Sequence, residues 1–336
     1  MKKGITIKDI ARKLNMSVST VSKALNNNPS ISELTRERVQ QFAKNAHYVR
    51  NEAARHFKQN RSFTIGVIMP DLLDQFYVLA VNGVEEVANK KNYNVLISQT
   101  HEDNEKERDV VENMMRNRVD GVIIAVTKNT KNIELFKRLL QTGIPIVFFS
   151  RSFAQPEFDF VSTDNEGGAL RAVNFLIDRG HKRIAHLMGP SLFKTSHQRL
   201  EGYKKALKAH HIAYDPGLVM EIDFTQEKTF NTVEKLMQLE HPPTAFFTFK
   251  NYLSLDVISF LKRNHAELID KTDVIGFGNL PLIKYLDHKP AASIDENSFG
   301  MGVEAASLIF KRIEAIEDEP VHEPQFIKVP GKLVQH

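Results

Sequence analysis

A short polar stretch near the N-terminus has the residue types and spacing of a surface that reads DNA bases. Its small or polar side chains can approach base edges without steric hindrance; they are Ser17, Ser19, Thr20, Ser22, Lys23 and Asn26. Between them, Val18, Val21, Ala24 and Leu25 recur at helical spacing and form one apolar stripe. Ser17 can cap the N-terminus of this helix. The pattern predicts a helix with one buried face and one face suited to the major groove.

A second apolar stripe precedes the first and predicts its packing partner. Within the stretch from Thr6 to Leu14, the apolar residues Ile7, Ile10, Ala11 and Leu14 again recur at helical spacing. Two short helices joined by a tight turn form a helix-turn-helix. An ordinary helical hairpin inside a larger core would show the same spacing, so spacing alone does not decide between the two.

The distribution of charge favours the DNA-binding interpretation. Residues 1–61 contain thirteen Lys and Arg against four Asp and Glu, a net charge of +9, whereas the whole chain carries +4. The remainder therefore carries −5. A basic head on a mildly acidic body indicates a polyanionic partner for the head alone.

Several classes of protein lack support in this sequence. There is no Cys, so disulfides and thiolate chemistry are excluded. We find no phosphate-binding loop, HExxH, GxSxG or dinucleotide fingerprint, and His210 and His211 are adjacent, so their side chains diverge on a helix. The charged run from Glu102 to Glu112 is expected to be a solvated helix face. The sequence predicts no enzyme, no metal and no cofactor.

Localisation is predicted from hydrophobic patterning. The basic start at Met1 is not followed by the apolar run of a signal peptide, and the chain has no run of about 18 apolar residues. We therefore expect a cytoplasmic protein that does not enter a membrane.

The head is expected to contain three helices. Residues 26–30, Asn-Asn-Asn-Pro-Ser, have the composition of a loop. Ser32 then starts a third helix, in which Leu34, Val39, Phe42 and Ala43 are expected to complete the core. Residues 49–62 are basic and have Phe57 as their one large apolar side chain, which predicts a linker that becomes ordered on binding.

From Phe63 onward, β-rich runs alternate with amphipathic helical patterns. The predicted strands are residues 64–69, 93–98, 121–125 and 144–149, then 183–188, 244–248, 274–277 and 292–294. Repeated βα units predict an α/β body with two parallel sheets, each covered by helices on both faces. In such sheets ligands bind beyond the carboxyl ends of the strands, so the cleft between the two sheets is the expected site.

Residues just past the predicted strand ends are the candidates for this cleft. They lie at 71–77, 99–101, 150–151, 164–165, 190–199, 224, 250–251 and 278–279. The alternative for each of them is that it only caps a helix.

At this point the chain resembles the LacI family of transcriptional regulators, and the resemblance covers nearly its whole length. The motifs are at residues 6–11 (TIKDIA), 18–26 (VSTVSKALN), 65–71 (IGVIMPD), 119–123 (VDGVI), 164–168 (DNEGG), 180–185 (GHKRIA), 199–203 (RLEGY) and 274–277 (VIGF). The resemblance implies a helix-turn-helix head over 1–48, a hinge over 49–62 and a type I periplasmic-binding-protein body. The body's N-terminal subdomain would comprise 63–163 plus 295–320, and its C-terminal subdomain 164–291 plus 321–336.

The resemblance assigns DNA-binding roles to particular residues. Val18, Ser19 and Lys23 match the positions that read the major groove, and the rest of the polar stretch and Thr6 accompany them. Ala54, Arg55 and Phe57 match the hinge segment that enters the minor groove, next to Asn51 and Lys58. Phe57 stands where the family usually has a leucine wedge, and Lys23 where arginine is common, which removes a bidentate contact to guanine.

The effector cleft departs from the family pattern. Sugar-binding members often carry an Asn-Asp pair at the positions of Lys250 and Asn251 and an Asp at the position of Gly278. In this chain one of these carboxylates is replaced by an amide, the other is absent, and a cation is added at Lys250. Lys250, Arg199 and Arg151 therefore suggest a ligand with negative charge, such as an anionic sugar derivative. The candidate effector-binding residues are Phe76, Gln99, Ser150, Arg151, Asp164, Arg199, Phe224, Lys250, Asn251 and Asn279.

Two alternatives stay open. Lys250 could point outward from a degenerate cleft in a regulator controlled by a protein partner, and a solute-binding protein would share the body fold. The expected mechanism pairs two copies through their bodies on a pseudo-palindromic DNA operator, with effector binding shifting the equilibrium between two body conformations.

Overall fold

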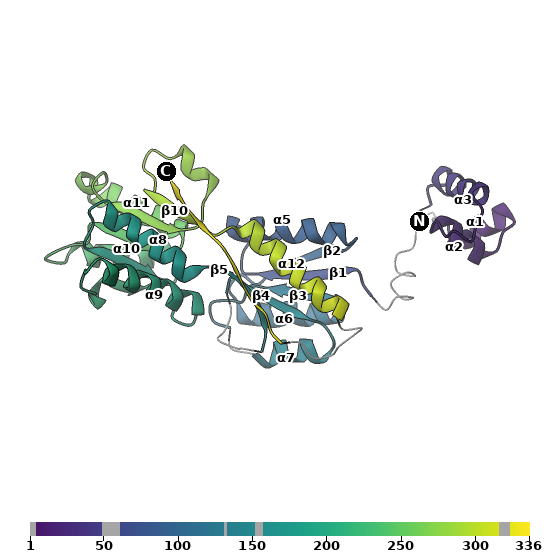
Figure 1. Cartoon of the computed structure of the whole chain (residues 1–336), viewed down its shortest axis with the longest axis horizontal. Helices are drawn as coiled ribbons and strands as arrows, with labels where there is room; N and C mark the ends of the chain where they lie inside the picture. The colour runs from purple at the N-terminus through teal and green to yellow at the C-terminus, as the bar shows by residue number, and fades with distance from the viewer. Residues whose placement is uncertain (1–4, 49–60, 131–132, 152–156, 316–322) are drawn as a thin grey trace. The chain divides into compact units, whose positions relative to one another are not determined.

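The structure is a computed structural model that describes residues 5–48, 61–130, 133–151, 157–315 and 323–336 (Figure 1). The chain divides into two compact units, Met1–Ser62 and Phe63–His336.

The first unit contains the three predicted helices, α1 (Ile7–Leu14), α2 (Val18–Leu25) and α3 (Glu33–Asn45). Each begins after a hydroxyl residue whose side chain accepts a hydrogen bond from a backbone N–H three residues later; these caps are Thr6, Ser17 and Ser32. Such caps satisfy backbone donors that the first turn of a helix leaves unpaired. The helices enclose a small apolar core in which Ile10, Val21 and Val39 are fully buried.

The predicted core role of Leu34 is wrong. Its side chain is 80% exposed, whereas Val39 and Ala43 of the same helix are buried and Phe42 packs partly against the core. Leu34 lies five residues before Val39, which places it about 140° around the helix from that buried position.

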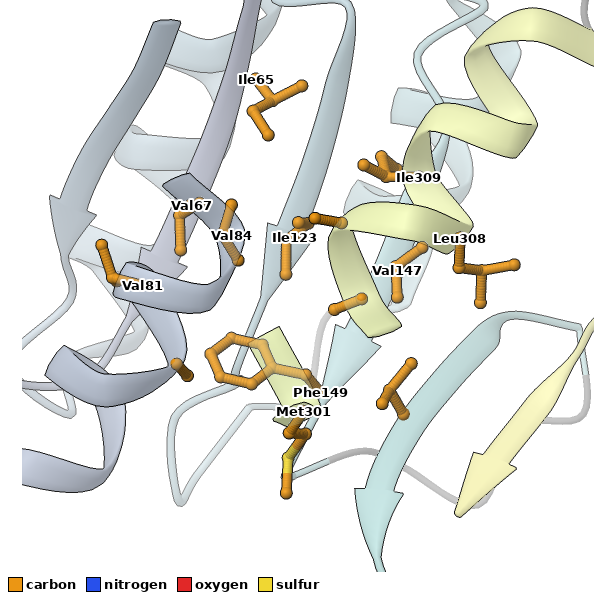
Figure 2. Close-up of a cluster of buried hydrophobic side chains, with 14 of the residues drawn as sticks. Ile65, Val67, Val81, Val84, Ile123, Val147, Phe149, Met301, Leu308 and Ile309 are labelled. Carbon is orange, nitrogen blue, oxygen red and sulfur yellow. The ribbon is translucent and has the colours of Figure 1, made fainter. Parts of the chain in front are cut away.

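The second unit has two subdomains, and the first is built on a wholly parallel sheet in the order β11-β5-β4-β3-β1-β2. Its strands are β1 (Thr64–Met69), β2 (Asn94–Gln99), β3 (Gly121–Ile124), β4 (Ile146–Phe149), β5 (Asp159–Thr163) and β11 (Phe326–Val329). One face is covered by α5 (Gln75–Lys90) and α12 (Ser298–Ala315), and the other by α6 (Asn104–Arg116) and α7 (Ile133–Gln141). Figure 2 shows the apolar cluster between the sheet and the α5–α12 pair.

The second subdomain repeats this three-layer plan, with the strand order β12-β10-β9-β8-β6-β7. Its strands are β6 (Ile184–Met188), β7 (Val219–Glu221), β8 (Ala245–Thr248), β9 (Asp273–Phe277), β10 (Ala292–Asp295) and β12 (Lys332–Gln335). All neighbours are parallel except β12, which runs antiparallel to β10. The helices α8 (Asn165–Asp178) and α9 (Lys194–Ala209) cover one face, and α10 (Gln226–Met237) and α11 (Asn251–Asn264) cover the other. Three short 3-10 helices, Pro216–Leu218, Ala266–Leu268 and Pro281–Tyr285, lie in the connections.

The chain crosses between the subdomains after β5, after β10 and between β11 and β12 (Figure 1). The third crossing corrects the predicted boundary, which assigned all of 321–336 to the second subdomain. Strand β11 instead pairs in parallel with β5, with Phe326 opposite Phe160 and Val329 opposite Thr163. The last segment therefore contributes one strand to each sheet.

Close backbone packing fixes α5 against α12. A Cβ atom at Gly302 would lie 1.9 Å from the carbonyl oxygen of Ala80, and one at Gly83 would lie 2.2 Å from that of Phe299. Only glycine permits this approach. The contact holds α5 rigidly, and the N-terminus of α5 borders the cleft described below.

Candidate DNA-reading face and effector cleft

The helix α2 presents the predicted polar face to solvent. Val18, Ser19, Lys23 and Asn26 are exposed, and Val18 remains 42% exposed although it belongs to the apolar stripe. An exposed Val at the start of α2 is suited to apolar contact with a thymine methyl group. Thr20 and Ser22 are half-buried. The outward residues of α2 thus form a patch of small and polar side chains that includes one basic side chain, Lys23.

The C-terminal end of α2 is held by α3. Asn27 adopts a left-handed conformation (φ 56°), and the N–H of Asn28 donates to the carbonyl of Lys23, which together form a helix C-cap. The side-chain amide of Gln40 donates to the Ala24 carbonyl at 3.2 Å and to Asn27 Oδ1 at 2.7 Å. The orientation of the end of α2 therefore depends on a side chain of α3.

The predicted hinge residues lie outside the described part of the chain. They are Asn51, Ala54, Arg55, Phe57 and Lys58. Their assignment to the minor groove stays a prediction.

A cleft opens between the two sheets of the body, as the topology predicts. Its cavity has a volume of about 60 Å³ and is lined by residues from the strand ends and helix N-termini of both subdomains. Seven of the ten predicted effector residues line it: Phe76, Ser150, Arg151, Arg199, Lys250, Asn251 and Asn279. A cavity of this volume has room for a few water molecules.

Arg199 is the most enclosed charged group of the cleft. Its guanidinium donates to Asn165 Oδ1 at 2.9 Å, to the Phe249 carbonyl and to Glu296 Oε1 at 2.8 Å. The ring of Phe277 lies 3.6 Å from the guanidinium carbon. Burial lowers the pKa of Arg199 to about 10, although the neighbouring Glu296 favours its charged form. Burial raises the pKa of Glu296, because it also disfavours the charged form of the carboxyl group.

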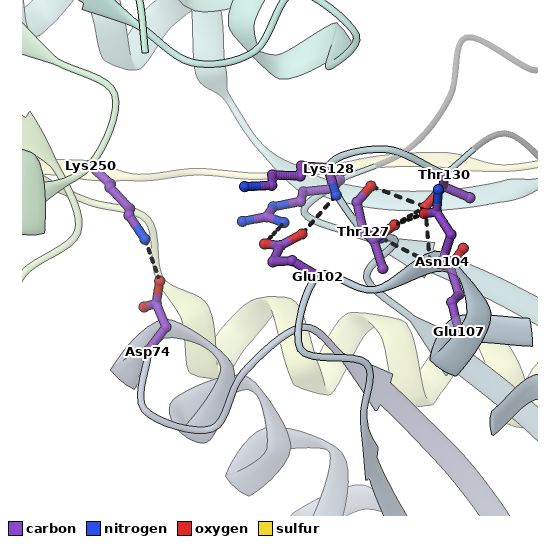
Figure 3. Close-up of polar contacts among 9 residues, drawn as sticks. Asp74, Glu102, Asn104, Glu107, Thr127, Lys128, Thr130 and Lys250 are labelled. Carbon is purple, nitrogen blue, oxygen red and sulfur yellow. Dashed lines mark hydrogen bonds and ion pairs between the residues drawn. The ribbon is translucent and has the colours of Figure 1, made fainter. Parts of the chain in front are cut away.

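The other two cations of the cleft also have carboxylate partners. Lys250 Nζ lies 3.3 Å from Asp74 Oδ2 (Figure 3). Arg151 Nη1 lies 2.6 Å from Glu102 Oε1. The predicted preference for an anionic ligand assumed that these cations were uncompensated, and this assumption is wrong. Each cation is neutralised within the protein.

Three predicted effector residues are not among those that line the cavity. The Gln99 side chain accepts a hydrogen bond from the backbone N–H of Leu72 at 2.9 Å. Asp164 caps α8, as the helix-capping alternative predicted for such residues. The ring centre of Phe224 is 5.1 Å from Lys250 Nζ and 5.6 Å from the guanidinium carbon of Arg151, so Phe224 contacts two residues of the lining.

The candidate list omitted several lining residues, among them Asp74, Thr195 and Glu296. Asp74 and Thr195 fall within the stretches that follow predicted strands, but nothing in the sequence distinguished them from their neighbours. Glu296 follows β10 directly, so the rule that sites lie beyond strand ends would have found it. The side chains of Thr195 and Asn251 are both almost fully buried, and within the described part of the chain Thr195 Oγ1 and Asn251 Oδ1 have no hydrogen-bond partner.

The burial of Glu107 corrects another expectation. Glu107, predicted to be part of a solvated helix face, is 3% exposed and accepts hydrogen bonds from the Thr127 backbone N–H at 2.8 Å and the Thr130 hydroxyl at 2.9 Å (Figure 3). Burial raises its pKa to about 7. Glu102 binds the adjacent backbone N–H of Lys128 at 2.7 Å. These two carboxylates fix the loop after β3 beside Arg151.

Within the described ranges, no three His, Asp or Glu side chains are grouped so that they could hold a metal ion. No helix in the same ranges has the length and hydrophobicity needed to cross a membrane.

Comparison with known families gives matches over both units. The family described as "Bacterial regulatory proteins, lacI family" matches residues 6–51, and "Periplasmic binding proteins and sugar binding domain of LacI family" matches residues 62–336.

Individual proteins match over nearly the whole chain. The HTH-type transcriptional repressor CytR of Escherichia coli (strain K12) is 32% identical over 92% of this chain and 90% of its own length. Catabolite control protein A of Priestia megaterium is 29% identical over 96% of this chain and 98% of its own.

Two solved structures share the fold. The lac repressor dimer bound to operator superimposes with a TM-score of 0.83 at 21% identity, covering 99% of this chain and 98% of that one. The complex of the transcriptional regulator CelR with cellobiose gives 0.72 at 23% identity, covering 98% of each chain.

Proposed function

Because the chain belongs to the LacI family of DNA-binding transcriptional regulators, we propose that it is a repressor whose affinity for a specific operator is controlled by a small polar molecule in the cleft of its body. In this proposal the protein regulates transcription and does not catalyse a reaction. The observation that carries the operator-binding part is the exposed polar face of α2 in a helix-turn-helix whose segment, residues 1–61, has a net charge of +9.

The build of the cleft supports a small-molecule effector. The cleft is lined from both subdomains, and two of its buried polar atoms, Thr195 Oγ1 and Asn251 Oδ1, have no partner among the described residues. Buried polar groups favour a ligand that supplies the missing hydrogen bonds. A hydroxyl-rich molecule such as a sugar has donors and acceptors for both. Because it would touch both subdomains, it would change the free-energy difference between two body conformations.

Two copies of the chain are proposed to act together. A pair of heads on a two-fold axis reads two half-sites of a pseudo-palindrome, so the binding of one head raises the effective concentration of the other at its half-site. The lac repressor, whose fold this chain shares, is a dimer on its operator. In this chain the outer strand of the first sheet, β2, exposes Leu96 and Ile97, and we assign the pairing surface to this edge.

The proposal is tested in two steps. Selection from a random DNA pool with the full-length protein should enrich a two-fold symmetric sequence, and a pool without enrichment would contradict sequence-specific binding. A thermal-shift screen of sugars, nucleosides and their phosphates should then find compounds that raise the melting temperature, and such compounds should change operator affinity in a gel-shift assay.

A second candidate form of control follows from the small size of the cavity and the internal pairing of all its cations. A regulator with a degenerate cleft would respond to a protein partner. A screen in which no compound stabilises the protein, although the operator is bound, would favour this form.

A further inference from the structure

The ion pair between Lys250 and Asp74 joins the two subdomains across the cleft. Lys250 follows β8 in the second subdomain, and Asp74 precedes α5 in the first (Figure 3). Their charged atoms are 3.3 Å apart, and their side chains are 25% and 19% exposed. Both groups are thus largely withdrawn from water, where charges interact more strongly than at an open surface.

Both partners are held in place by further contacts. Asp74 Oδ1 accepts a hydrogen bond from the backbone N–H of Phe76 at 3.1 Å and caps α5, while its second oxygen faces Lys250. Next to Asp74, the Leu73 carbonyl accepts a hydrogen bond from the Tyr252 hydroxyl at 3.2 Å. Lys250 Nζ also lies 5.4 Å from the centre of the Tyr252 ring. The pair is therefore a positioned element of the cleft and not a chance meeting of flexible side chains.

Each cation that lines the cavity is paired with one carboxylate. The lining contributes three cations, Arg151, Arg199 and Lys250, and two carboxylates, Asp74 and Glu296. The third carboxylate is Glu102, which binds Arg151. A charged ligand would leave one of these partially buried groups without its partner.

We infer that the Asp74–Lys250 pair makes the cleft selective for uncharged polar effectors. A phosphate or carboxylate can reach Lys250 only by displacing Asp74, and the displaced carboxylate would stay half-buried beside the ligand's negative charge. A hydroxyl group can accept a hydrogen bond from Lys250 or donate one to Asp74 while the pair stays formed. This inference rests on the proposed effector function of the cleft.

The inference predicts a gain of anion binding when Asp74 loses its charge. Asp74→Asn keeps an oxygen that can cap α5 and removes the carboxylate charge that is paired with Lys250. With inorganic phosphate as the probe, titrated at constant ionic strength, calorimetry should show binding to D74N at least about tenfold tighter than to the native protein, about 1.4 kcal/mol. The double variant D74N/K250M should lose this gain.

Asp71→Asn is the matched control. It removes one negative charge from the same loop, where Asp71 Oδ1 accepts from the Leu73 N–H at 2.8 Å, and Asp71 does not line the cavity. If D71N gains as much phosphate affinity as D74N, net charge explains the effect and the inference fails. It also fails if D74N, folded according to its melting curve, binds phosphate no better than the native protein. The proposed function is tested separately, by operator selection with the native protein in the absence of phosphate. A failure of that selection is therefore distinguishable from a failure of the phosphate titration.

Discussion

Lys23 is the side chain of α2 on which base discrimination is expected to depend most. It is exposed near the C-terminal end of the helix and is the one basic residue of the reading face. We predict that Lys23→Ala lowers affinity for the selected operator by about 1–3 kcal/mol and relaxes the preference at one base pair of each half-site.

The measurement is a gel-shift titration on operator and on scrambled DNA. Lys44→Ala, which removes the same charge from an exposed position in the last turn of α3, serves as control and should affect both DNAs alike. An equal loss on both DNAs for the Lys23 variant would remove Lys23 from base reading.

Two buried titratable residues are expected to make the free energy of unfolding depend on pH, with opposite signs. Burial lowers the pKa of His186 to about 4 and raises that of Glu107 to about 7. Below its ordinary pKa of 6.5, His186 takes up a proton only in the unfolded chain, so its contribution to stability is complete above pH 6.5 and falls toward pH 4. Above its ordinary pKa of 4.5, Glu107 loses its proton only in the unfolded chain, so stability falls as pH rises toward 7. Each effect can reach about 3 kcal/mol.

Single variants should separate these two opposing effects of pH on stability. Relative to the native protein, Glu107→Gln should become more stable as pH rises from 4.5 to 7, and His186→Phe should become more stable as pH falls from 6.5 to 4. Urea unfolding across this pH range gives the difference directly. His210→Gln, at the exposed C-cap of α9, is the control and should follow the native profile. Parallel profiles for all three variants would contradict the burial argument.

At the scale of elements, periodicity in the sequence located helices and strands that carry their own apolar pattern. The three head helices and eight strands, such as β1 and β6, were predicted in this way. Strand β5 was missed because it begins with Asp159, whose carboxylate is buried and accepts two hydrogen bonds of 2.7 Å from Arg312. These two residues are 153 positions apart, so only the folded chain shows that the strand can hold a charge.

For the cleft, too, the sequence predicted the position of the site but not the contacts between distant residues. Topology predicted where the site would lie, and seven of the ten candidate residues do line it. The sequence did not show their partners, because Asp74 is 176 residues from Lys250. The net charge of the cleft therefore could not be read from the residues after the strand ends.

The contact between α2 and α3 leads to a prediction at this scale. Gln40→Leu keeps a side chain of comparable bulk but removes both hydrogen bonds to the end of α2. Each such bond is worth about 0.5–1.5 kcal/mol, and their loss should loosen the segment that carries Lys23 and Asn26. We expect a lower ratio of operator to scrambled-DNA affinity, with scrambled-DNA affinity unchanged.

The control is Gln41→Leu on the exposed side of α3, where the native amide donates to Asn45 of the same helix at 3.1 Å. It should leave the ratio unchanged. A Gln40 variant that melts at lower temperature but keeps the native ratio would show a role in stability alone.

At the scale of the whole molecule, the charge separation assigns different tasks to the two units. In the proposed function, the basic head attracts DNA, and the body, with a net charge of −5 over residues 62–336, provides control and pairing. The chain crosses three times between the subdomains, and in the proposed function a ligand in the cleft would bias their relative orientation. The proposed control of DNA affinity then requires that two heads be coupled through paired bodies.

This coupling predicts that one substitution in the body, outside the DNA-binding head, should weaken operator binding. Ile97 lies on the outer strand β2 and is 37% exposed; a lysine there would place like charges at a two-fold pairing surface, where each copy presents the same patch to the other. In sedimentation, Ile97→Lys should shift the protein from dimer toward monomer. Operator affinity should fall toward that of a single half-site, while the melting temperature of the body changes little.

The control for this prediction is Leu239→Lys, which replaces a side chain of similar exposure, 40%, in the second subdomain and away from β2. It should leave both sedimentation and operator binding unchanged. If the Ile97 variant remains a dimer, the pairing surface lies elsewhere on the body. If it becomes monomeric but binds the operator as tightly as the native protein, operator binding does not depend on pairing of the bodies. The proposed control of DNA affinity by a ligand in the cleft is then contradicted.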